Sequence, residues 1–503
     1  MKYLMNWLSV QSKSITEPTE KEGMYSFASY QLVSALFLRL LGVIYLIAFA
    51  SLSVQIEGLI GSTGILPIAE ELAFQASSGI ANYFRPLTLF WINASDEALL
   101  GATVAGSIFS ILIILNRFQL ISLIAAFVLY LSLHQVSQPF LNFQWDGLLL
   151  ETGLLAIFLA TRTGIVIFLF RWLLFKLRFL SGISKLSSGD PAWSGLTALN
   201  SYFEVQPLPT PFAWYVHLFP EWLLRFGTGA TLVIEILVPF MMFMPRKWRF
   251  AAAWITIFWQ LLIILTSNHN WINFLTIALC LFLFDDRAIR NFIQWVKSVK
   301  KIRPANSITQ ADGLYRRLRI STAAMLAILI LAFNAAQFWA LVTRQPVSGD
   351  LGVVLKTIES YRTFNMYHVF PTMTTQRIEL EISGSHDGRE WRPYRFKYKP
   401  EEPGQRPVFI LPHQPRLDWQ MWFVSLQSKQ LPWFEQFLYA LLENAPAATS
   451  LLEHNPFKDV PPGFIRVDAS RYTFTTPEQR QITGEWWQRE PLGPFRPLPG
   501  VKR

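Results

Sequence analysis

The sequence is short of cysteine and of charge. A single cysteine, Cys280, stands among 503 residues, which excludes an intrachain disulfide framework and a CxxC redox pair. Charged residues make up only 16% of the chain, against about 25% in an average soluble domain. No GxSxG, HExxH or phosphate-loop motif is present, and the histidines lack the spacing of metal ligands. The sequence therefore predicts no metal site and no cofactor.

Long apolar runs fill the first two thirds of the chain. Hydrophobic residues make up 52% of the sequence, and the mean hydropathy is +0.29. A run of about 17–25 apolar residues is long enough for one helix to cross a bilayer. The predicted fold class is a mainly α polytopic membrane bundle of about nine transmembrane helices. We expect these helices at 32–52, 99–115, 119–136, 143–160, 164–180, 221–244, 250–267, 272–284 and 321–342.

The composition changes after the last predicted span, and a soluble β-rich C-terminal domain is expected there. Ile378, Leu380 and Ile382 alternate with charged residues, a pattern typical of a strand with one buried face. A turn signal follows at 385–388. Apolar spacing then predicts further strands at 394–398 and 464–474 and a helix at 433–443.

The distribution of Lys and Arg predicts an orientation and a division into domains. These residues concentrate in alternate loops, and such loops tend to stay cytoplasmic. We expect the basic connection 285–319 to contact anionic lipid headgroups, and no nucleic-acid motif accompanies it. The predicted division is a cytoplasmic segment 1–29, a transmembrane domain 30–344 with an ordered outer loop at 181–221, and an extracytoplasmic β-rich domain 345–503.

Charged residues inside the predicted spans are the most unusual feature of the bundle. The segment 142–160 carries Asp146 and Glu151, although a carboxylate near the centre of a membrane helix costs roughly 2.5–3.5 kcal/mol. Counting to equal depths on either side of the turn at 161–163 predicts an ion pair between Glu151 and Arg171. The partner of Asp146 stays open between this hairpin and another helix. Further candidates for the same polar cluster are Lys176, Arg178, Glu235 and Arg39.

Two interpretations of these charges are open. In the first, they hold the bundle together and fix its register. In the second, they line a polar cavity that opens outward beneath the loop 181–221. That loop is rich in Gly, Pro and aromatic residues, which favours either a lid or binding surface, or an aromatic anchor at the membrane interface. Its candidate surface residues are Lys185, Asp190, Trp193, Glu204, Gln206 and Trp214.

Four segments resemble signature segments of the lipase maturation factor family. They read FQWDGLLLETG, LSGISKLSSGDPAWSGLTAL, QPLPTPFAWYVH and PHQPRLDWQMWF. The resemblance covers nearly the whole chain, from QIEGLIGSTGILP at 55–67 to NPFKDVPPGFIRV at 455–467. The membrane part is also distantly similar to that of vitamin K-dependent carboxylases. Within the resemblance, Tyr202 stands where the family usually has a histidine, and 266–273 reads TSNHNWIN rather than TGNYNFFN, so His-dependent chemistry is not expected there.

The resemblance implies a chaperone-like maturation factor that assists folding and assembly of secreted lipases or other secreted clients. It also implies a multi-pass protein of the endoplasmic reticulum membrane, or of the inner membrane in a bacterial member, with a cytoplasmic N-terminus and a lumenal or periplasmic C-terminal domain. The single cysteine favours the bacterial case. The alternative is a membrane-embedded enzyme acting on a lipid or a secreted polypeptide, with a buried carboxylate, Lys176 or Lys185 as the base.

The tail segment 412–422 has two interpretations of its own. In one, Arg416 and Asp418 tie a loop into the sheet through hydrogen bonds. In the other, the segment is a surface that faces the client. The candidate residues of this C-terminal domain surface are His413, Arg416, Asp418, Trp419 and Trp422.

Overall fold

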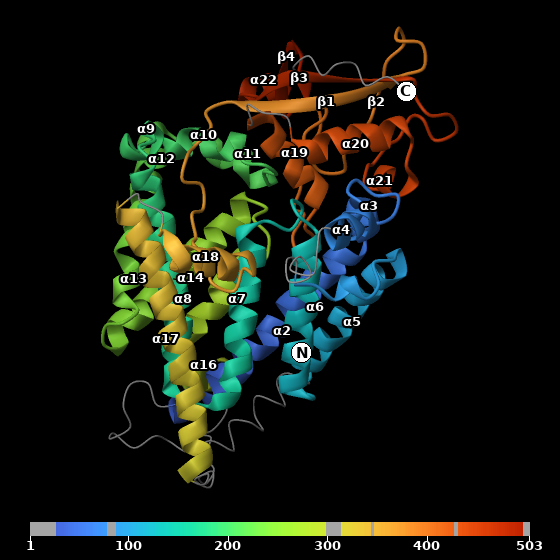
Figure 1. The fold of residues 1–503 in the computed structure, drawn as a ribbon. Helices are drawn as coiled ribbons and strands as arrows, with labels where there is room; N and C mark the ends of the chain where they lie inside the picture. The colour runs from blue at the N-terminus through green and yellow to red at the C-terminus, as the bar shows by residue number, and fades with distance from the viewer. Residues whose placement is uncertain (1–26, 78–86, 298–312, 344–346, 427–430, 496–503) are drawn as a thin grey trace.

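A helical bundle stands below a small antiparallel sheet in the computed structural model of the chain (Figure 1). The structure describes residues 27–77, 87–297, 313–343, 347–426 and 431–495. Most of the predicted cytoplasmic segment (1–26) and the middle of the predicted basic connection (298–312) lie outside the described residues.

The bundle consists of two groups of helices with two further helices between them. One group holds α2 (Gln31–Ser53), α5 (Asp96–Ile114) and α6 (Gln119–Val136). The other holds α8 (Gly164–Ser187), α12 (Glu221–Ile236), α13 (Val238–Met241), α14 (Arg246–Thr266) and α17 (Gly313–Thr343). Between the groups lie α7 (Gln144–Phe158) and α15 (Trp271–Leu279).

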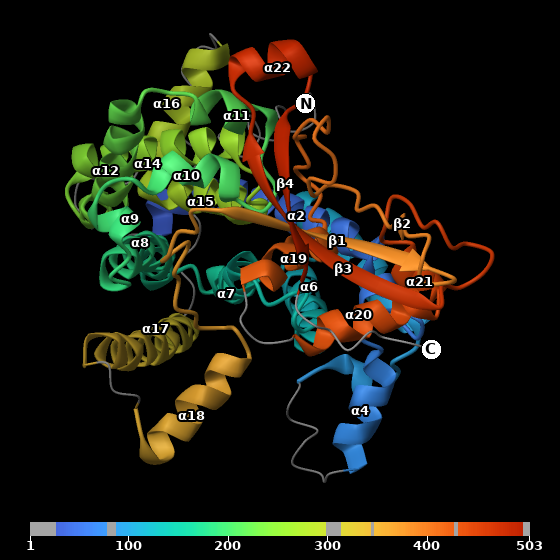
Figure 2. The same ribbon diagram turned by 90° about the horizontal axis from the view of Figure 1, so that it is seen from above.

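Shorter elements connect these helices. The bundle contains η1 (Phe27–Tyr30), α3 (Ile56–Ile60), α4 (Ile68–Ser77), η3 (Leu89–Trp91), η4 (Leu159–Thr161), η5 (Cys280–Leu283) and α16 (Asp286–Lys297). The predicted outer loop contains α9 (Pro191–Ser194), α10 (Ala198–Val205) and α11 (Pro211–His217). Seen from above, α17 and the following α18 (Gly349–Ser360) lie at one edge of the molecule (Figure 2).

Six helices in the described parts of the chain are long and apolar enough to cross a membrane, and the predicted count of about nine is not confirmed. The other predicted spans fall on α7, on the charge-bearing α8, and on the short α15 with η5. Their surroundings explain the difference, because α7, α8 and α15 are largely buried among other helices and can carry charge or stop short. The six are Gln31–Ser53, Asp96–Ile114, Gln119–Val136, Glu221–Met241, Arg246–Thr266 and Arg317–Ala340.

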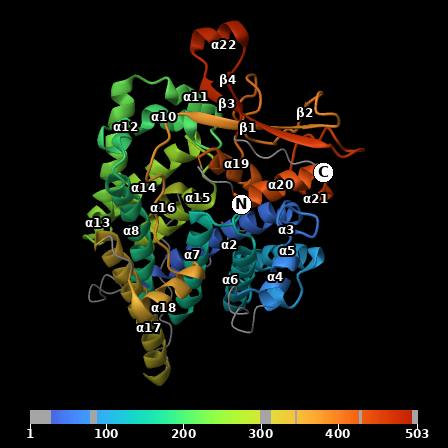
Figure 3. The same cartoon turned by 45° about the horizontal axis from the view of Figure 1, so that its top comes forward.

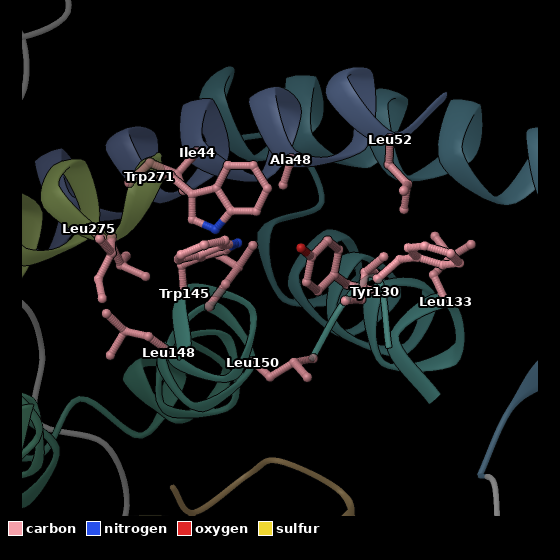
Figure 4. Packing of buried hydrophobic residues seen from close by; sticks show 14 of the residues in the cluster. Ile44, Ala48, Leu52, Tyr130, Leu133, Trp145, Leu148, Leu150, Trp271 and Leu275 are labelled. Carbon is pink, nitrogen blue, oxygen red and sulfur yellow. The ribbon is translucent and has the colours of Figure 1, made fainter. Parts of the chain in front are cut away.

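Aromatic and aliphatic side chains fill the space between α2, α6, α7 and α15. Figure 4 shows Trp145 of α7 and Trp271 of α15 beside Ile44 of α2, with Tyr130 of α6 nearby. The helices approach closely at Gly153, because a Cβ there would lie 1.9 Å from the Tyr45 hydroxyl. Small residues allow such close approach in membrane bundles, where dispersion contacts supply much of the helix association.

A carboxylate that is distant in sequence caps the first long helix, α2. Asp286 in α16 accepts hydrogen bonds from the backbone N–H groups of Leu32 and Val33, at 3.0 and 2.9 Å. The first turn of a helix has unpaired N–H groups, and a carboxylate there also complements the helix dipole. The start of α2 is thereby fixed to the segment that follows η5.

The C-terminal domain is built on a four-stranded antiparallel sheet in the order β2-β1-β3-β4. Its strands are β1 (Arg377–Ser385), β2 (Arg392–Pro393), β3 (Phe464–Phe474) and β4 (Trp487–Pro494). Its helices are α19 (Arg416–Leu426), α20 (Pro432–Leu442), α21 (Pro446–Thr449) and α22 (Pro477–Thr483). The strand predicted at 464–474 and the helix predicted at 433–443 are confirmed.

The strand predicted at 394–398 is wrong. The pairing with β1 ends after Arg392 and Pro393 with one further hydrogen bond, from the Tyr394 N–H to the Ile382 carbonyl, and Arg395 forms a bridge with His454 instead. Tyr394 and Phe396 are nevertheless buried. The alternating pattern therefore predicts burial correctly at these two positions but not at Lys399, which is buried, and the backbone leaves the ladder to meet a different partner.

Candidate functional site

Most of the predicted site residues lie where the bundle meets the C-terminal domain. In the tilted view, α10 and α11 of the outer loop stand at the same end as β1 and α19 (Figure 3). This junction contains three separate buried charge clusters, centred on Asp146, Glu151 and Glu235.

Asp146 pairs with the C-terminal domain. It lies in the first turn of α7, and Arg416 of α19 contacts both of its carboxylate oxygens, at 2.6 and 2.8 Å. The Tyr130 hydroxyl donates to the same carboxylate at 2.5 Å. Asp146 is 0% exposed and Arg416 1%. The pair is bidentate and desolvated, so it fixes orientation as well as distance between the two parts.

The predicted ion pair between Glu151 and Arg171 is wrong. Glu151 pairs with Lys176 at 2.5 Å and accepts a hydrogen bond from the Tyr367 hydroxyl at 2.7 Å. Arg171 instead donates to the Phe282 carbonyl at 2.9 Å. The turn between the helices contains η4 and a left-handed residue, so α7 and α8 do not leave it at equal depth. Glu151 consequently meets a residue more than one helical turn further along α8.

Glu235 holds two cations from α8. Lys185 donates to it at 2.7 Å, and the Arg178 guanidinium lies 3.4 Å from its other oxygen. Lys185 also donates to the Val369 carbonyl at 2.8 Å, which brings the C-terminal chain to this cluster. Arg39 does not join these groups: it lines a separate cavity of about 520 Å³ with Gln119 and Arg162.

Five of the six candidate residues of the outer loop are buried, and the prediction that they form a surface is wrong. Of the candidates, Lys185, Trp193, Glu204, Gln206 and Trp214 are at most 9% exposed, and Asp190 is half-buried. The reason is that the C-terminal domain covers the loop.

Hydrogen bonds attach the C-terminal domain to the outer loop. Arg377 of β1 donates to the carbonyls of Glu204, Gln206 and Pro207, at 2.9, 2.5 and 2.8 Å. The Glu204 carboxylate accepts from the Phe474 N–H at 2.8 Å. Burial raises the pKa of Glu204. Further contacts run from Trp193 to Phe370, from Trp214 to Thr475 and from Met373 to Asp190.

From Arg416 onward the segment 412–422 belongs to the helix α19 rather than to a loop, and the surface predicted there is wrong for its central residues. Arg416, Asp418 and Trp419 are 1–3% exposed, because α19 packs between the sheet and the bundle. The Asp418 carboxylate accepts the N–H groups of Tyr398 and Lys399, and burial raises its pKa to about 6. At the edges of the segment, His413 contacts Ser51 and Trp422 donates to the Val205 carbonyl.

A largely apolar cavity of about 480 Å³ lies between α8, α12, α14 and α15, under α10 and α11. Its polar lining includes the Glu235 cluster together with Gln260, Asn273 and Tyr202. The candidate residues included the charged groups but not Gln260 or Asn273. Amides inside predicted apolar spans were the available signal, since polar groups there are costly unless they have partners.

A fourth buried charge cluster, inside the C-terminal domain, was not predicted. Lys399 pairs with Glu401 and lies 3.5 Å from Glu379, which in turn pairs with Arg377 at 2.6 Å. Burial raises the pKa of Glu401 to about 7, with Lys399 and Arg395 opposing that rise. Alternation of charges along β1 was the only sequence signal. Within the described residues, no group of three or more His, Cys, Asp or Glu side chains is placed to hold a metal ion.

Comparisons with known proteins cover nearly the whole chain. A model of the lipase maturation factor transmembrane domain matches residues 32–291, and a model of the lipase maturation factor C-terminal domain matches residues 363–497. Lipase maturation factor 2 of Xenopus laevis is 32% identical over 93% of this chain and 82% of its own length. Human lipase maturation factor 2 is 31% identical (93% and 83%), and mouse lipase maturation factor 1 is 31% identical (96% and 89%). No solved structure matches the chain.

Proposed function

This chain belongs to the lipase maturation factor family, and on that premise we propose that it is a chaperone-like membrane protein that assists the folding and assembly of secreted lipases. The observation that carries the proposal is the similarity to named maturation factors over both the membrane part and the C-terminal part. A secreted lipase would then be its client.

The junction between the two parts supports this role. Buried polar contacts at Arg416, Tyr367 and Arg377 hold the C-terminal domain against the bundle. A folding factor that works beside a membrane benefits from a domain held at fixed height and orientation, because less conformational entropy is lost when a client binds. The intramembrane charges then have a structural role: they position the domain.

The charge distribution supports an orientation for this function. The helix α16 and the first part of α17 lie at the end of the bundle away from the sheet (Figure 1), and these segments and the start of α14 are rich in Lys and Arg. Arg246 pairs there with Asp285, and Arg319 donates to the Thr161 carbonyl. By the positive-inside tendency this end faces the cytoplasm. Segment 1–29 would be cytoplasmic, 30–344 the membrane domain, and 345–503 a lumenal or periplasmic domain where secreted proteins fold.

Gene deletion in the source organism tests the proposal. We expect secreted lipases to lose activity per molecule while their transcription and the membrane lipid composition stay unchanged. A plasmid copy should restore the activity, and so should its Arg225→Ala variant, because Arg225 forms an exposed ion pair with Glu221 on the same helix. The Asp146→Asn variant should restore less because it loosens the junction. Normal specific activity of lipases in the deletion strain, or an altered lipid with normal lipases, would contradict the proposal.

A further inference from the structure

The cavity under α10 and α11 has a polar end whose hydrogen-bond donors are unused. Arg178 Nε and Nη2, Gln260 Nε2 and Asn273 Nδ2 have no hydrogen-bond partner among the described residues. These residues are 7%, 2% and 3% exposed, and all three line the cavity. Buried donors without partners are rare and each costs about 1–3 kcal/mol. Three residues with unused donors in the wall of one cavity indicate an acceptor that the protein itself does not supply.

The charge at this end is positive. Arg178 and Lys185 both face Glu235, so two cations share one carboxylate. Lys185 also donates to the carbonyls of Ser181 and Val369, and its donors are therefore used. Among the described residues, the polar contact of Arg178 is the 3.4 Å ion pair with Glu235. An underused guanidinium in an apolar site favours a carboxylate or phosphate, which it can bind through two parallel hydrogen bonds.

The rest of the cavity is apolar and of ligand size. Its volume of about 480 Å³ lies in the range of small-molecule sites, roughly 300–1,000 Å³. Aliphatic and aromatic side chains line most of it, among them Leu177, Leu199, Phe203, Leu224, Ile263 and Ile272. Such walls suit an alkyl chain, since each buried CH₂ contributes about 0.8 kcal/mol.

The cavity has walls that reach the membrane-facing surface. Phe226 of α12 and Leu262 of α14 line it and are 70% and 38% exposed. Both helices are long and apolar enough to cross a membrane. They are joined through α13 at one end, and toward the other end α10 packs on α12 and α11 packs on α14. A hydrophobic molecule in the bilayer would therefore contact these walls of the cavity directly.

From these four observations we propose that the cavity binds a lipid with a single alkyl chain in the apolar part and an anionic head group, carboxylate or phosphate, on Arg178, Gln260 and Asn273. The proposal does not depend on the role in lipase maturation. It assigns a binding function to the Glu235 cluster, in which Arg178 keeps unused hydrogen-bond donors.

Photocrosslinking of the full-length protein in phosphatidylcholine nanodiscs tests this. Three probes carry the same alkyl diazirine: palmitate, lysophosphatidate and the uncharged hexadecanol. We expect palmitate, lysophosphatidate or both to label peptides of α8, α12, α14 and α15 at least tenfold more than hexadecanol does. The probe that labels these peptides shows whether the natural ligand is a free fatty acid or a phospholipid. Equal labelling by hexadecanol would overturn the anionic head group.

Variants separate specific binding from general contact with lipid. Arg178→Met leaves the Lys185–Glu235 pair intact and should lower anionic labelling at least tenfold. Ile263→Trp should fill the cavity and abolish labelling, whereas Leu261→Trp, an exposed position on the same helix outside the cavity, should not change it. If Arg178→Met and Ile263→Trp proteins that elute as monodisperse species are labelled like the unmodified protein, the site does not exist.

Discussion

At the scale of single residues, the buried pair between Asp146 and Arg416 should be highly sensitive to mutation. Removing one partner leaves a buried charge unpaired, which typically costs 3–5 kcal/mol. We therefore expect Asp146→Asn and Arg416→Met each to lower the melting temperature of the protein in mild detergent. The double variant should cost less than the sum of the two, because no unpaired charge remains.

An exposed pair on α12 is the control for this cycle. Arg225 lies 2.8 Å from Glu221, and both side chains are more than half exposed. Surface pairs of this kind contribute roughly 0.2–1 kcal/mol, so Arg225→Ala should barely change the melting temperature. Additive losses from Asp146→Asn and Arg416→Met would show that the two residues are not coupled.

Glu401 predicts a pH dependence of stability. Its ordinary pKa is 4.5, and burial raises it to about 7 in the folded protein. Between these values the folded state binds more protons than the unfolded chain, so this residue's contribution to the unfolding free energy falls as the pH rises from 4.5 to 7. The loss should reach at most about 3 kcal/mol. The neighbouring charges are Lys399, Glu379 and Arg395.

Thermal unfolding at pH 5 and pH 7.5 measures this contribution. We expect the unmodified protein to lose more stability between the two pH values than the Glu401→Gln variant does, since the amide does not titrate. The comparison between the two proteins removes the contribution of all other titrating groups. Parallel pH profiles would place the pKa of Glu401 near its ordinary value.

The sequence predicted the charged residues of the junction better than their pairing. A charged residue inside an apolar segment can be recognised from the sequence alone, and this pattern identified Asp146, Glu151, Lys176 and Glu235. The partner of Asp146 is 270 residues away in the C-terminal domain, and no local pattern encodes that distance. The partner of Glu151 depended on the offset between two helices, which a short turn alone does not determine.

At the scale of elements, close helix packing depends on Gly153. A Cβ at this position would lie 1.9 Å from the Tyr45 hydroxyl, so Gly153→Ala should push α7 away from α2. We expect a loss of about 1–3 kcal/mol, as for other overpacked cores, visible as a lower melting temperature. Adding Tyr45→Phe should recover part of the loss, because the hydroxyl that clashes is removed.

Gly101 of α5 is the matched control for this substitution. No atom outside its own helix lies within 4 Å of a Cβ built there. Gly101→Ala should therefore be neutral or stabilise by up to about 1 kcal/mol through helix propensity. Equal effects of the two substitutions would show that backbone flexibility, rather than packing against Tyr45, explains the result.

Periodicity located elements well where each element's own core face decides its structure. β3 and α20 are such cases, with one side buried against the domain core. Periodicity was less successful where contacts with a neighbouring element determine where a helix or strand ends. α7 and α15 are short because other helices and the C-terminal chain surround them, and β2 ends early because Arg395 pairs with His454. The helix α19 has a nearly uniform buried surface, so its sequence lacks the amphipathic pattern that would have predicted it.

At the scale of the whole molecule, the bundle and the C-terminal domain should remain associated without a covalent link. Arg416, Tyr367 and Arg377 connect the two parts at separate places, and Arg377 alone satisfies three carbonyls of the outer loop. A protease recognition sequence inserted between α17 and α18 allows the chain to be cut after folding. We expect the two fragments to elute together from a size-exclusion column in mild detergent.

Weakening the junction should reverse that result. Arg377→Met leaves three buried carbonyls without donors, and Arg416→Met leaves Asp146 unpaired, so both parts gain by exposing these groups to water. After cleavage, the doubly substituted protein should separate into two fragments. Arg466→Met is the control, because Arg466 lies on the same sheet but its partly exposed side chain contacts Asp468 and Trp391 of the C-terminal domain rather than the bundle. Separation of the cleaved unmodified protein would show that the covalent connection, rather than the buried contacts, holds the domain on the bundle.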